Sequence, residues 1–399
     1  MKILMTAESY YPFLNKGGPA VKIRAIALRL AKLGHRVTVL TSDWGFQPSM
    51  VSLAISTEKT RFGWRMQESG VETFFLPSLA NYRSVSVNPR VLVFASRVRE
   101  HDIVHIYGLY DLLGPPVTVF CRRNHIPYVV EPMGMFRPII RNLLLKNAYH
   151  VVLGNRLLRS ARLLIATSDQ ERNEMVDGGT NPQRVVVRRN GVERPSVIPP
   201  RGAFRKQVAI PSDARVVLYL GRLEAKKSPE LLVAAFARWR KKSASNAHSF
   251  LAIAGPEHER GYVDRLNSLA SSLGISEGLK FTGPLYDDAK WSAYRDADVF
   301  VLPSQNENFG NSAAEAVACG TPVIVTERCG IAPYIAQRTG LVVAHDEEAI
   351  TRALAEILDR PELAARFRSA CPTVAKELSW DEPICQMVRI YERVCLEQL

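Results

Sequence analysis

Short apolar runs alternate with helix-length amphipathic segments along the whole 399-residue chain. Each run is long enough only for a buried strand, so the alternation predicts an α/β fold whose parallel sheets carry helices on both faces. In the first half the expected strands are Ile3–Ala7, Val37–Leu40, Glu72–Leu76, Ile103–Ile106, Tyr128–Val130, Leu163–Thr167 and Val185–Arg188. In the second half they are Val216–Leu220, Phe250–Ala254, Leu279–Thr282, Val299–Leu302, Val323–Val325 and Leu341–Val343.

The length of the chain favours two domains, because a single core rarely grows beyond about 300 residues. A proline-rich segment, Glu193–Gly202, is the natural linker. We expect two doubly wound domains facing each other across a cleft. Their bounds are a first domain over 1–195, a linker over 196–210, a second domain over 211–378 and a terminal helix over 379–399.

The terminal helix is amphipathic, and this pattern alone fits two arrangements. The helix packs either on the second domain alone or across both domains. Its apolar face consists of Ile384, Met387, Ile390, Tyr391 and Val394.

The composition is that of a globular chain, with 47% hydrophobic and 23% charged residues and no apolar stretch of membrane-spanning length. The N-terminal residues pass directly into a strand and lack the features of a secretory signal. The six cysteines have neither metal-ligand nor disulfide spacing. A cytoplasmic location is therefore expected.

The basic excess lies in the first half of the chain. Residues 1–200 hold 27 Lys and Arg against 14 Asp and Glu, whereas residues 201–399 hold 25 of each. Because the bases are dispersed and no nucleic-acid-binding motif accompanies them, an anionic membrane surface or a diphosphate-bearing acceptor is favoured over nucleic acid. The segment Phe136–Lys146, with Arg156, Arg159 and Arg162, is the candidate patch, and an ordinary helix with a basic outer face is the alternative.

The segment Pro303–Pro322 is the most informative for function. It places Glu307 and Glu315 eight positions apart, across a predicted strand, a loop and a helix that begins near Asn311 or Ser312. Glu307 then lies at the carboxyl edge of a sheet, where α/β proteins bind ligands, and the first helical turn offers N–H groups to an anion. A nucleotide-sugar, with phosphates between two hydroxyl-rich groups, fits this arrangement.

Two glycine-containing turns add groups suited to phosphate. Arg222 and Lys227 follow the predicted strand Val216–Leu220 and can balance a diphosphate without a metal. Gly17 and Gly18 precede a predicted helix over Ala20–Leu33 and permit close approach of backbone to phosphate, although a tight turn would need glycines too.

Two further constellations carry less specific signals. Asp296-Ala-Asp298 has the form of a metal-binding DxD motif but precedes a strand, at the wrong edge for a ligand, so a turn is favoured and no metal is expected. His105 and Tyr107 share one face of the fourth strand, where they can either reach the cleft or pack inside.

With these motifs the chain resembles the retaining, GT-B-fold glycosyltransferases of family 4 (glycosyl transferases group 1) over nearly its whole length. The most specific match is Glu307-x7-Glu315 followed by Ala316-x-Ala318-Cys-Gly320-Thr-Pro322. Weaker matches are Gly17-Gly18, Asn190-Gly191-Val192, Gly221-Arg222-Leu223 with Lys227, Ala254-Gly255-Pro256, Phe281-Thr-Gly283, Pro303-Ser304 and Ser379-Trp380-Asp381. The last of these matches the family's C-terminal helix, which implies that residues 379–399 cross back to the first domain.

The resemblance implies a role for each matched residue. The catalytic residues would be Arg222, Lys227 and Glu307, of which Arg222 and Lys227 hold the donor diphosphate. The backbone or side chains that complete the donor site would be Gly17, Gly18, Leu285, Asn308, Phe309, Gly310, Asn311, Ser312 and Glu315. Within this set Glu315 would bind the ribose, Leu285 would lie against the base, and Glu307 with the backbone of 308–310 would hold the sugar.

The acceptor side departs from the family pattern. Candidates there are His105, Tyr107, Glu131 and Arg137. Many relatives carry His-x-His where this chain has His105-Ile-Tyr107, and others a histidine near Glu131. Ser228 also replaces the usual glycine after the lysine.

The implied function is retaining transfer of a hexosyl group from a UDP- or GDP-linked sugar to a saccharide or lipid-linked saccharide, without metal or cofactor. Cell-surface polysaccharide synthesis at the inner face of the membrane is the expected setting. Two alternatives stay open: a non-catalytic nucleotide-sugar-binding protein that docks on membrane or RNA, and a sugar-nucleotide epimerase of the same architecture.

Overall fold

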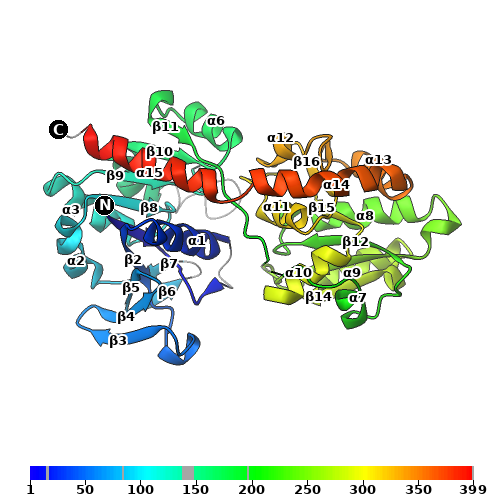
Figure 1. Cartoon of the computed structure of the whole chain (residues 1–399), viewed down its shortest axis with the longest axis horizontal. Helices are drawn as coiled ribbons and strands as arrows, with labels where there is room; N and C mark the ends of the chain where they lie inside the picture. Colours follow the sequence, from blue (N-terminus) through cyan, green and yellow to red (C-terminus); the bar gives the residue numbers. More distant parts are fainter. Residues whose placement is uncertain (15–17, 83–84, 137–147, 196, 398–399) are drawn as a thin grey trace. The chain divides into compact units, whose positions relative to one another are not determined.

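The computed structural model describes residues 1–14, 18–82, 85–136, 148–195 and 197–397 (Figure 1). The chain divides into two compact units. Unit 1 comprises Met1–Arg189 together with Asp381–Leu399, and unit 2 comprises Asn190–Trp380. Each unit is built on a largely parallel sheet that carries helices, which confirms the α/β prediction.

Unit 1 contains a nine-stranded sheet with the order β11-β10-β9-β8-β1-β2-β5-β4-β3. The strands from β11 to β5 pair in parallel, whereas β4 pairs antiparallel with both β5 and β3. A separate hairpin joins β6 and β7. The bounds are β1 Lys2–Ala7, β2 Arg36–Ser42, β3 Ser56–Thr60, β4 Gly63–Glu68, β5 Val71–Leu76, β6 Ala80–Tyr82, β7 Val85–Val87, β8 Ile103–Tyr107, β9 Tyr128–Glu131, β10 Leu163–Ala166 and β11 Val185–Val187.

The helices of unit 1 connect these strands or cover their sheet. In the described residues they are α1 Gly18–Lys32, α2 Val91–Phe94, α3 Gly114–Arg123, α5 Asn155–Ser160, α6 Asp169–Asp177 and α15 Asp381–Leu396, with the 3-10 helices η2 Pro48–Met50, η3 Ala95–Glu100 and η5 Pro182–Arg184 and the π-helix η4 His150–Gly154. The last helix, α15, belongs to unit 1 although α14 before it belongs to unit 2. The predicted apolar face of α15 is buried, so this helix crosses back to the first unit.

Unit 2 contains six parallel strands in the order β14-β13-β12-β15-β16-β17. Counted along the chain, this is the order 3-2-1-4-5-6 of a dinucleotide-binding sheet. The bounds are β12 Arg215–Leu220, β13 Ser249–Ala254, β14 Leu279–Gly283, β15 Val299–Leu302, β16 Val323–Thr326 and β17 Gly340–Val343.

Helices cover both faces of the second sheet. Successive side chains of a strand point alternately into the two cores between the sheet and these helices. Val217 and Tyr219 pack in the core with α8, α9 and α13, whereas Val216 and Leu218 pack in the core with α7, α10, α11, α12 and α14 (Figure 1). The bounds are α7 Ala203–Gln207, α8 Pro229–Arg240, α9 Tyr262–Ser272, α10 Asp287–Asp296, α11 Asn311–Ala318, α12 Ala332–Ile335, α13 Glu347–Leu358 and α14 Pro361–Glu377, with the turns η6 Ala225–Lys227, η7 Ala244–Asn246 and η8 Ser276–Gly278.

All thirteen predicted strands occur in the structure, but four strands were not predicted. The missed strands are β3, β4, β6 and β7. The strand β3 has the sequence Ser-Thr-Glu-Lys-Thr, and none of its residues is buried. This strand lies at the edge of the sheet and is held by antiparallel pairing with β4. It therefore has no apolar run from which the sequence could predict a strand.

The segment 196–210, predicted as a linker, belongs to unit 2 in the structure. The unit boundary falls between Arg189 and Asn190, and the segment contains α7. Phe204 is fully buried in the unit 2 core, and Asp296 accepts hydrogen bonds from the backbone N–H groups of Gly202 and Arg205. The prolines therefore lead into an element that packs on unit 2.

No helix within the described ranges is both long and apolar enough to cross a membrane.

Candidate active site

Two loops of unit 2 leave the sheet side by side, at the point where the strand order reverses. The first follows β12 and the second follows β15, and these two strands are hydrogen-bonded neighbours. From β12 the chain proceeds to β13 and β14 on one side of the sheet and then returns to β15 on the other. Such a switch point opens a crevice at the carboxyl ends of the strands, which makes it the expected ligand site.

Two glycines allow the loop after β12 to lie close to the neighbouring turn. A Cβ atom on Gly255 would come within 1.8 Å of the Gly221 carbonyl oxygen, and Gly255 has φ +146°. The Gly221 N–H donates to the Ala254 carbonyl, and the Leu223 N–H donates to the Pro256 carbonyl. Only glycine fits this contact, which fixes the backbone on both sides of Arg222.

Arg222 is the exposed cation of this loop. Its guanidinium lies 3.1 Å from a carboxylate oxygen of Glu224, and its side chain is 48% exposed. Its carbonyl oxygen accepts a hydrogen bond from the buried Tyr219 hydroxyl at 2.8 Å. The Tyr219 hydroxyl therefore fixes the main chain at Arg222. The guanidinium faces solvent, where it can contact a phosphate.

The loop after β15 is attached to its neighbours on two sides. The Glu307 N–H donates to the Arg328 carbonyl, and the Glu307 carbonyl accepts from the Gly330 N–H, as in a short parallel bridge. The Gln305 N–H donates to the Lys226 carbonyl at 3.0 Å, which joins this loop to the loop after β12. The loops after β12 and β15, which carry the predicted site residues of unit 2, are thus joined by a backbone hydrogen bond.

Glu307 and Lys227 form an ion pair between the two loops. The side chains are 19% and 15% exposed, so the pair is largely buried. Burial alone would raise the pKa of Glu307, but Lys227, and to a smaller degree Lys226 and Arg222, outweigh it and hold that pKa below its usual value. Glu307 is therefore ionised at neutral pH and is a hydrogen-bond acceptor only.

The helix α11 begins at this edge of the sheet, as predicted. Its N-cap, Gly310, has φ +103°, and its carbonyl accepts from the N–H groups of Ala313 and Ala314. The first N–H groups of the helix are not used by the helix itself. The buried Nδ2 atom of Asn308 has no hydrogen-bond partner among the described residues, so it is a donor available to a ligand hydroxyl.

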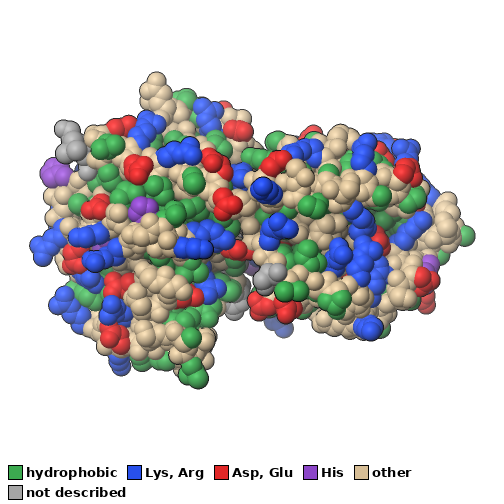
Figure 2. All heavy atoms as spheres, viewed as in Figure 1, with side chains coloured by type: hydrophobic (Ala, Val, Ile, Leu, Met, Phe, Trp, Pro, Cys, Tyr) green, Lys and Arg blue, Asp and Glu red, His purple; other side chains and the backbone are tan. Residues whose placement is uncertain are grey.

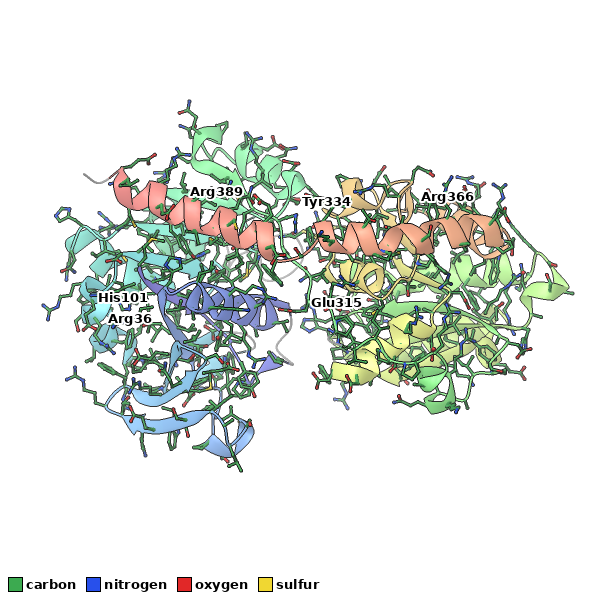
Figure 3. The ribbon with its side chains drawn as sticks, in the orientation of Figure 1. Arg36, His101, Glu315, Tyr334, Arg366 and Arg389 are labelled. Carbon is green, nitrogen blue, oxygen red and sulfur yellow. The ribbon has the colours of Figure 1, made fainter. Side chains whose placement is uncertain are left out.

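Glu315, which is labelled in Figure 3, lies one turn into α11 and is held by two side chains of α10. Lys290 Nζ lies 2.8 Å from Glu315 Oε1, and the Tyr294 hydroxyl donates to Glu315 Oε2 at 3.0 Å. Lys290 also lies 4.3 Å from the ring centroid of Trp291. Each carboxylate oxygen keeps further acceptor capacity, so Glu315 can accept from hydroxyl groups in a fixed orientation.

Leu285 and Phe309 have buried side chains, 8% and 2% exposed. The Phe309 ring packs against Tyr334, and its carbonyl accepts from the Ile331 N–H at 2.7 Å. These side chains form part of the unit 2 core. A ligand role for Phe309 would therefore involve its N–H, as the prediction requires.

The Asp296-Ala-Asp298 segment has a structural role. Asp296 binds the N-terminal end of α7, and Asp298 pairs with Arg205 at 3.2 Å and with Arg368 at 3.3 Å. These contacts use carboxylate oxygens that a metal would need. No group of three or more potential metal ligands is present in the described part of the chain.

In unit 1, the acceptor-side candidates form a buried charge cluster. Glu131 pairs with Lys22 of α1 and lies 2.5 Å from Arg188, and His105 Nδ1 bonds the hydroxyl of Tyr391 on α15 at 2.7 Å. The His105 and Tyr107 rings stack with centroids 3.8 Å apart. All six side chains of the cluster are at most 5% exposed: Lys22, His105, Tyr107, Glu131, Arg188 and Tyr391. The packed alternative for His105 and Tyr107 is the one observed.

The charges in this cluster shift its protonation strongly. Burial lowers the pKa of His105 to about 3, so this ring is neutral. Burial would raise the pKa of Glu131, but Arg188 and Lys22 lower it to about 2. Burial also lowers the pKa of Lys22 to about 8, against the pull of Glu131.

Three further predicted site residues are placed in neither the unit 2 constellation nor the unit 1 charge cluster. Gly18 is the first residue of α1 in unit 1. Gly17 and Arg137 lie outside the described residues. Their roles stay predictions.

Comparison with known proteins gives the family of the chain. The family described as "Glycosyl transferases group 1" matches residues 200–373, and the one described as "Glycosyl transferase 4-like domain" matches residues 17–191. D-inositol 3-phosphate glycosyltransferase 2 from Catenulispora acidiphila is 30% identical, over 95% of this chain and 90% of that protein. This chain belongs to the group 1 glycosyltransferases. D-inositol 3-phosphate glycosyltransferase from Thermomonospora curvata is 27% identical, over 94% and 90%.

Solved structures show that this glycosyltransferase has the GT-B fold. Sucrose-phosphate synthase from Thermosynechococcus elongatus matches with a TM-score of 0.77 at 21% identity, over 98% of both chains. HepE from Anabaena, in complex with UDP and glucose, matches with a TM-score of 0.77 at 17% identity, over 98% of this chain and 100% of that one. The predicted fold and family are confirmed.

Sequence reasoning missed several residues of these two sites. In this glycosyltransferase, Lys290 and Tyr294 are four positions apart on one helix, so helical spacing would have placed them on one face. Which carboxylate they face depends on the packing of α10 against α11. Lys22 carried a signal as well, because it is a lysine within the apolar face of α1.

Proposed function

We propose that this glycosyltransferase moves a hexosyl group from a nucleotide-sugar to a hydroxyl of a saccharide or lipid-linked saccharide, with retention and without a metal. The observation that carries the proposal is the convergence of Lys227, Arg222 and Glu307 at the start of α11. This part of unit 2 offers two cations and helix N–H groups for a diphosphate, flanked by two fixed carboxylates for hydroxyl groups.

The donor would bind along this edge of the sheet. Its diphosphate would interact with Arg222, Lys227 and the first turn of α11. Glu315, held by Lys290 and Tyr294, would accept hydrogen bonds from the ribose hydroxyls. Glu307 would accept from a sugar hydroxyl, and the unpartnered Asn308 amide would donate to another.

In the proposed reaction the bond from the sugar's anomeric carbon to the diphosphate oxygen breaks, and the acceptor oxygen attacks on the face that the diphosphate leaves. The proton of the acceptor hydroxyl passes to the departing phosphate oxygen, so no protein base is required. Negative charge grows on the leaving group, and Arg222 and Lys227 would stabilise it. Loss of one such group typically costs about 10²- to 10³-fold in kcat.

Names of similar proteins suggest substrates to test. HepE is described in complex with UDP and glucose, which favours UDP-glucose as the first donor, with GDP-linked sugars next. Two relatives are named D-inositol 3-phosphate glycosyltransferases, so inositol 3-phosphate is an acceptor to include. The basic first half favours an acceptor that is anionic or lies at an anionic membrane, as in cell-surface polysaccharide synthesis.

The test begins with thermal shift against a panel of UDP-, GDP- and ADP-sugars in buffer with EDTA, because a bound donor stabilises the folded state by mass action. Turnover is then measured with and without acceptors, and the anomeric configuration of the product is read by NMR. Arg222→Ala should lose about 10²-fold or more of kcat, whereas Arg352→Ala, an exposed arginine on α13, should not.

Each alternative result has a distinct meaning. Stabilisation without turnover of any donor would favour a non-catalytic binding protein. Conversion of the donor sugar without an acceptor would favour an epimerase. No stabilisation by any nucleotide-sugar would contradict the proposal.

A further inference from the structure

A groove of about 600 Å³ crosses the helical surface of unit 1, apart from the residues proposed to bind the donor. Its walls come from α2, α3 and the consecutive segment η4–α5. The helix α3 follows β8 and leads to β9, so it runs antiparallel to the strands. Its last turn, with Arg122 and Arg123, therefore lies away from the carboxyl edge of the sheet.

Aliphatic side chains are unusually exposed around this groove. Five of the fifteen exposed large hydrophobic side chains in the described residues belong to its helices. Their exposures are Val151 74%, Val152 69%, Leu92 59%, Val93 57% and Val119 37%. Leu92, Val119 and Val152 line the groove itself, and Val93 and Val151 are their neighbours in the chain. Scattered exposed hydrophobic residues are ordinary, but a cluster of this kind marks a surface that another body covers.

Arginines surround the aliphatic side chains, and no acidic residue is among the described residues that line the groove. The lining includes Arg122, Arg123 and Arg156, all exposed. None of the three forms an ion pair with a described residue. The lining of the groove is thus apolar and basic. In Figure 2, basic and acidic side chains lie together over the part of the surface where Figure 1 places α2 and α3.

We propose that this arginine-rimmed groove docks the protein on a membrane that contains anionic phospholipids. Aliphatic side chains would enter the boundary between headgroups and acyl chains, and the guanidinium groups would lie at the level of the phosphates. Charge complementarity favours this partner over an acidic protein or RNA. A membrane uses apolar and basic contacts together, whereas single-stranded RNA is bound by exposed aromatic side chains, and Phe120 in this groove is half-buried.

This surface differs from the segment that the sequence suggested. Most of Phe136–Lys146 lies outside the described residues, whereas Arg156, from the same prediction, lines the groove. The other lining arginines come from the end of α3, which the sequence did not single out. The proposal is independent of the proposed catalytic residues, all of which lie elsewhere.

The test measures cosedimentation of the purified chain with vesicles of phosphatidylcholine alone and of phosphatidylcholine mixed with phosphatidylglycerol. Binding is expected only to the anionic vesicles and should weaken as salt is raised. Each arginine removed should weaken partitioning about five-fold, which corresponds to about 1 kcal/mol per basic residue at such a surface. Arg122→Gln with Arg123→Gln should therefore weaken it about 25-fold.

Matched variants separate this patch from overall charge. Lys32→Gln with Arg36→Gln removes the same charge from exposed positions elsewhere on unit 1 and should leave vesicle binding nearly unchanged (Figure 3 labels Arg36). Val151→Asn with Val152→Asn should weaken binding, whereas Leu53→Asn, at a fully exposed leucine, should not. Equal losses in the patch and control pairs would overturn the proposal.

Other occupants give other results. Equal binding to both kinds of vesicle would overturn the anionic recognition. A concentration-dependent dimer that Val151→Asn with Val152→Asn abolishes, without vesicle binding, would assign the groove to a second copy. All variants are first checked for unchanged thermal unfolding and unchanged donor-induced stabilisation, so a failure of folding or of the donor site is distinguished from a loss of membrane binding.

Discussion

Lys227, in the turn after β12, forms an ion pair with Glu307, in the loop after β15, so that two separate loops share one pair of charges. Both partners are at most 19% exposed. Removal of one partner leaves the other charge partly buried without compensation, which costs more than the pair itself contributes. The pair therefore links the stability of unit 2 to the proposed donor site.

The first prediction concerns this pair. Glu307→Gln and Lys227→Met should each lower the free energy of unfolding by about 1–3 kcal/mol. The double variant should lose clearly less than the sum of the two, because neither charge is then left alone. Urea unfolding of the four proteins gives the coupling energy. Additive losses would show that the two side chains do not interact.

The second prediction concerns the support of Glu315. Tyr294→Phe removes the hydroxyl that donates to Glu315 Oε2 at 3.0 Å and leaves the ring in the core. Because one positioning hydrogen bond is lost, the Kd of the nucleoside diphosphate should rise about 2- to 10-fold, with a smaller effect on kcat. Calorimetric titration and steady-state kinetics separate the two effects. Tyr262→Phe, which removes a hydroxyl bound to Glu230 on the opposite face of the sheet, is the control.

The third prediction concerns the contact between two glycines. Gly255→Ala would place a methyl group 1.8 Å from the Gly221 carbonyl oxygen, at a backbone φ of +146°. Backbone must move, so the cost should exceed about 3 kcal/mol, and the displaced Arg222 loop should lose donor affinity. Gly261→Ala is the matched control, because its φ is +76° but nothing lies within 4 Å of the new methyl. It should cost only about 1–2 kcal/mol, measured by the same unfolding experiment.

The fourth prediction concerns Ser228, the residue after Lys227. Its backbone is left-handed, with φ 50° and ψ 46°, and its hydroxyl bonds the Ala225 carbonyl and His345 Nε2. Ser228→Ala loses the hydroxyl but keeps the strained backbone, whereas Ser228→Gly loses both. The glycine variant should therefore be about 1 kcal/mol more stable than the alanine variant in urea unfolding. Equal stability would mean that the turn does not hold this conformation in solution.

The extent of successful prediction differs between the sheets and the site. Most of the thirteen predicted strands are buried on both faces, so their apolar runs were visible, whereas β3 is polar and depends on pairing with β4. Glu307 and Glu315 were recognised because they lie eight positions apart in one segment. The partners of Glu315 come from α10, and those of Glu131 come from α1 and from the residue after β11. Such pairings arise only when helices pack, which local spacing does not encode.

The last prediction concerns the pH dependence of the unit 1 charge cluster. The pKa of His105 falls from 6.5 to about 3 on folding, since burial, helped by Arg188 and Lys22, disfavours its charged form more than Glu131 favours it. Below pH 6.5 the unfolded chain takes up a proton at this ring that the folded chain does not. Stability contributed by His105 is thus present above pH 6.5 and is lost as pH falls toward 3.

One such group adds a slope of about 1.4 kcal/mol per pH unit. His105→Phe should remove that slope between pH 6 and pH 5, although it also loses the hydrogen bond to Tyr391 and lowers stability at neutral pH. Urea unfolding at several pH values measures the difference between the variant and the parent chain. If His105→Phe showed the same slope as the parent chain, His105 would have to be protonated in the folded protein, and the neutral, buried ring bonded to Tyr391 would be the wrong description of this cluster.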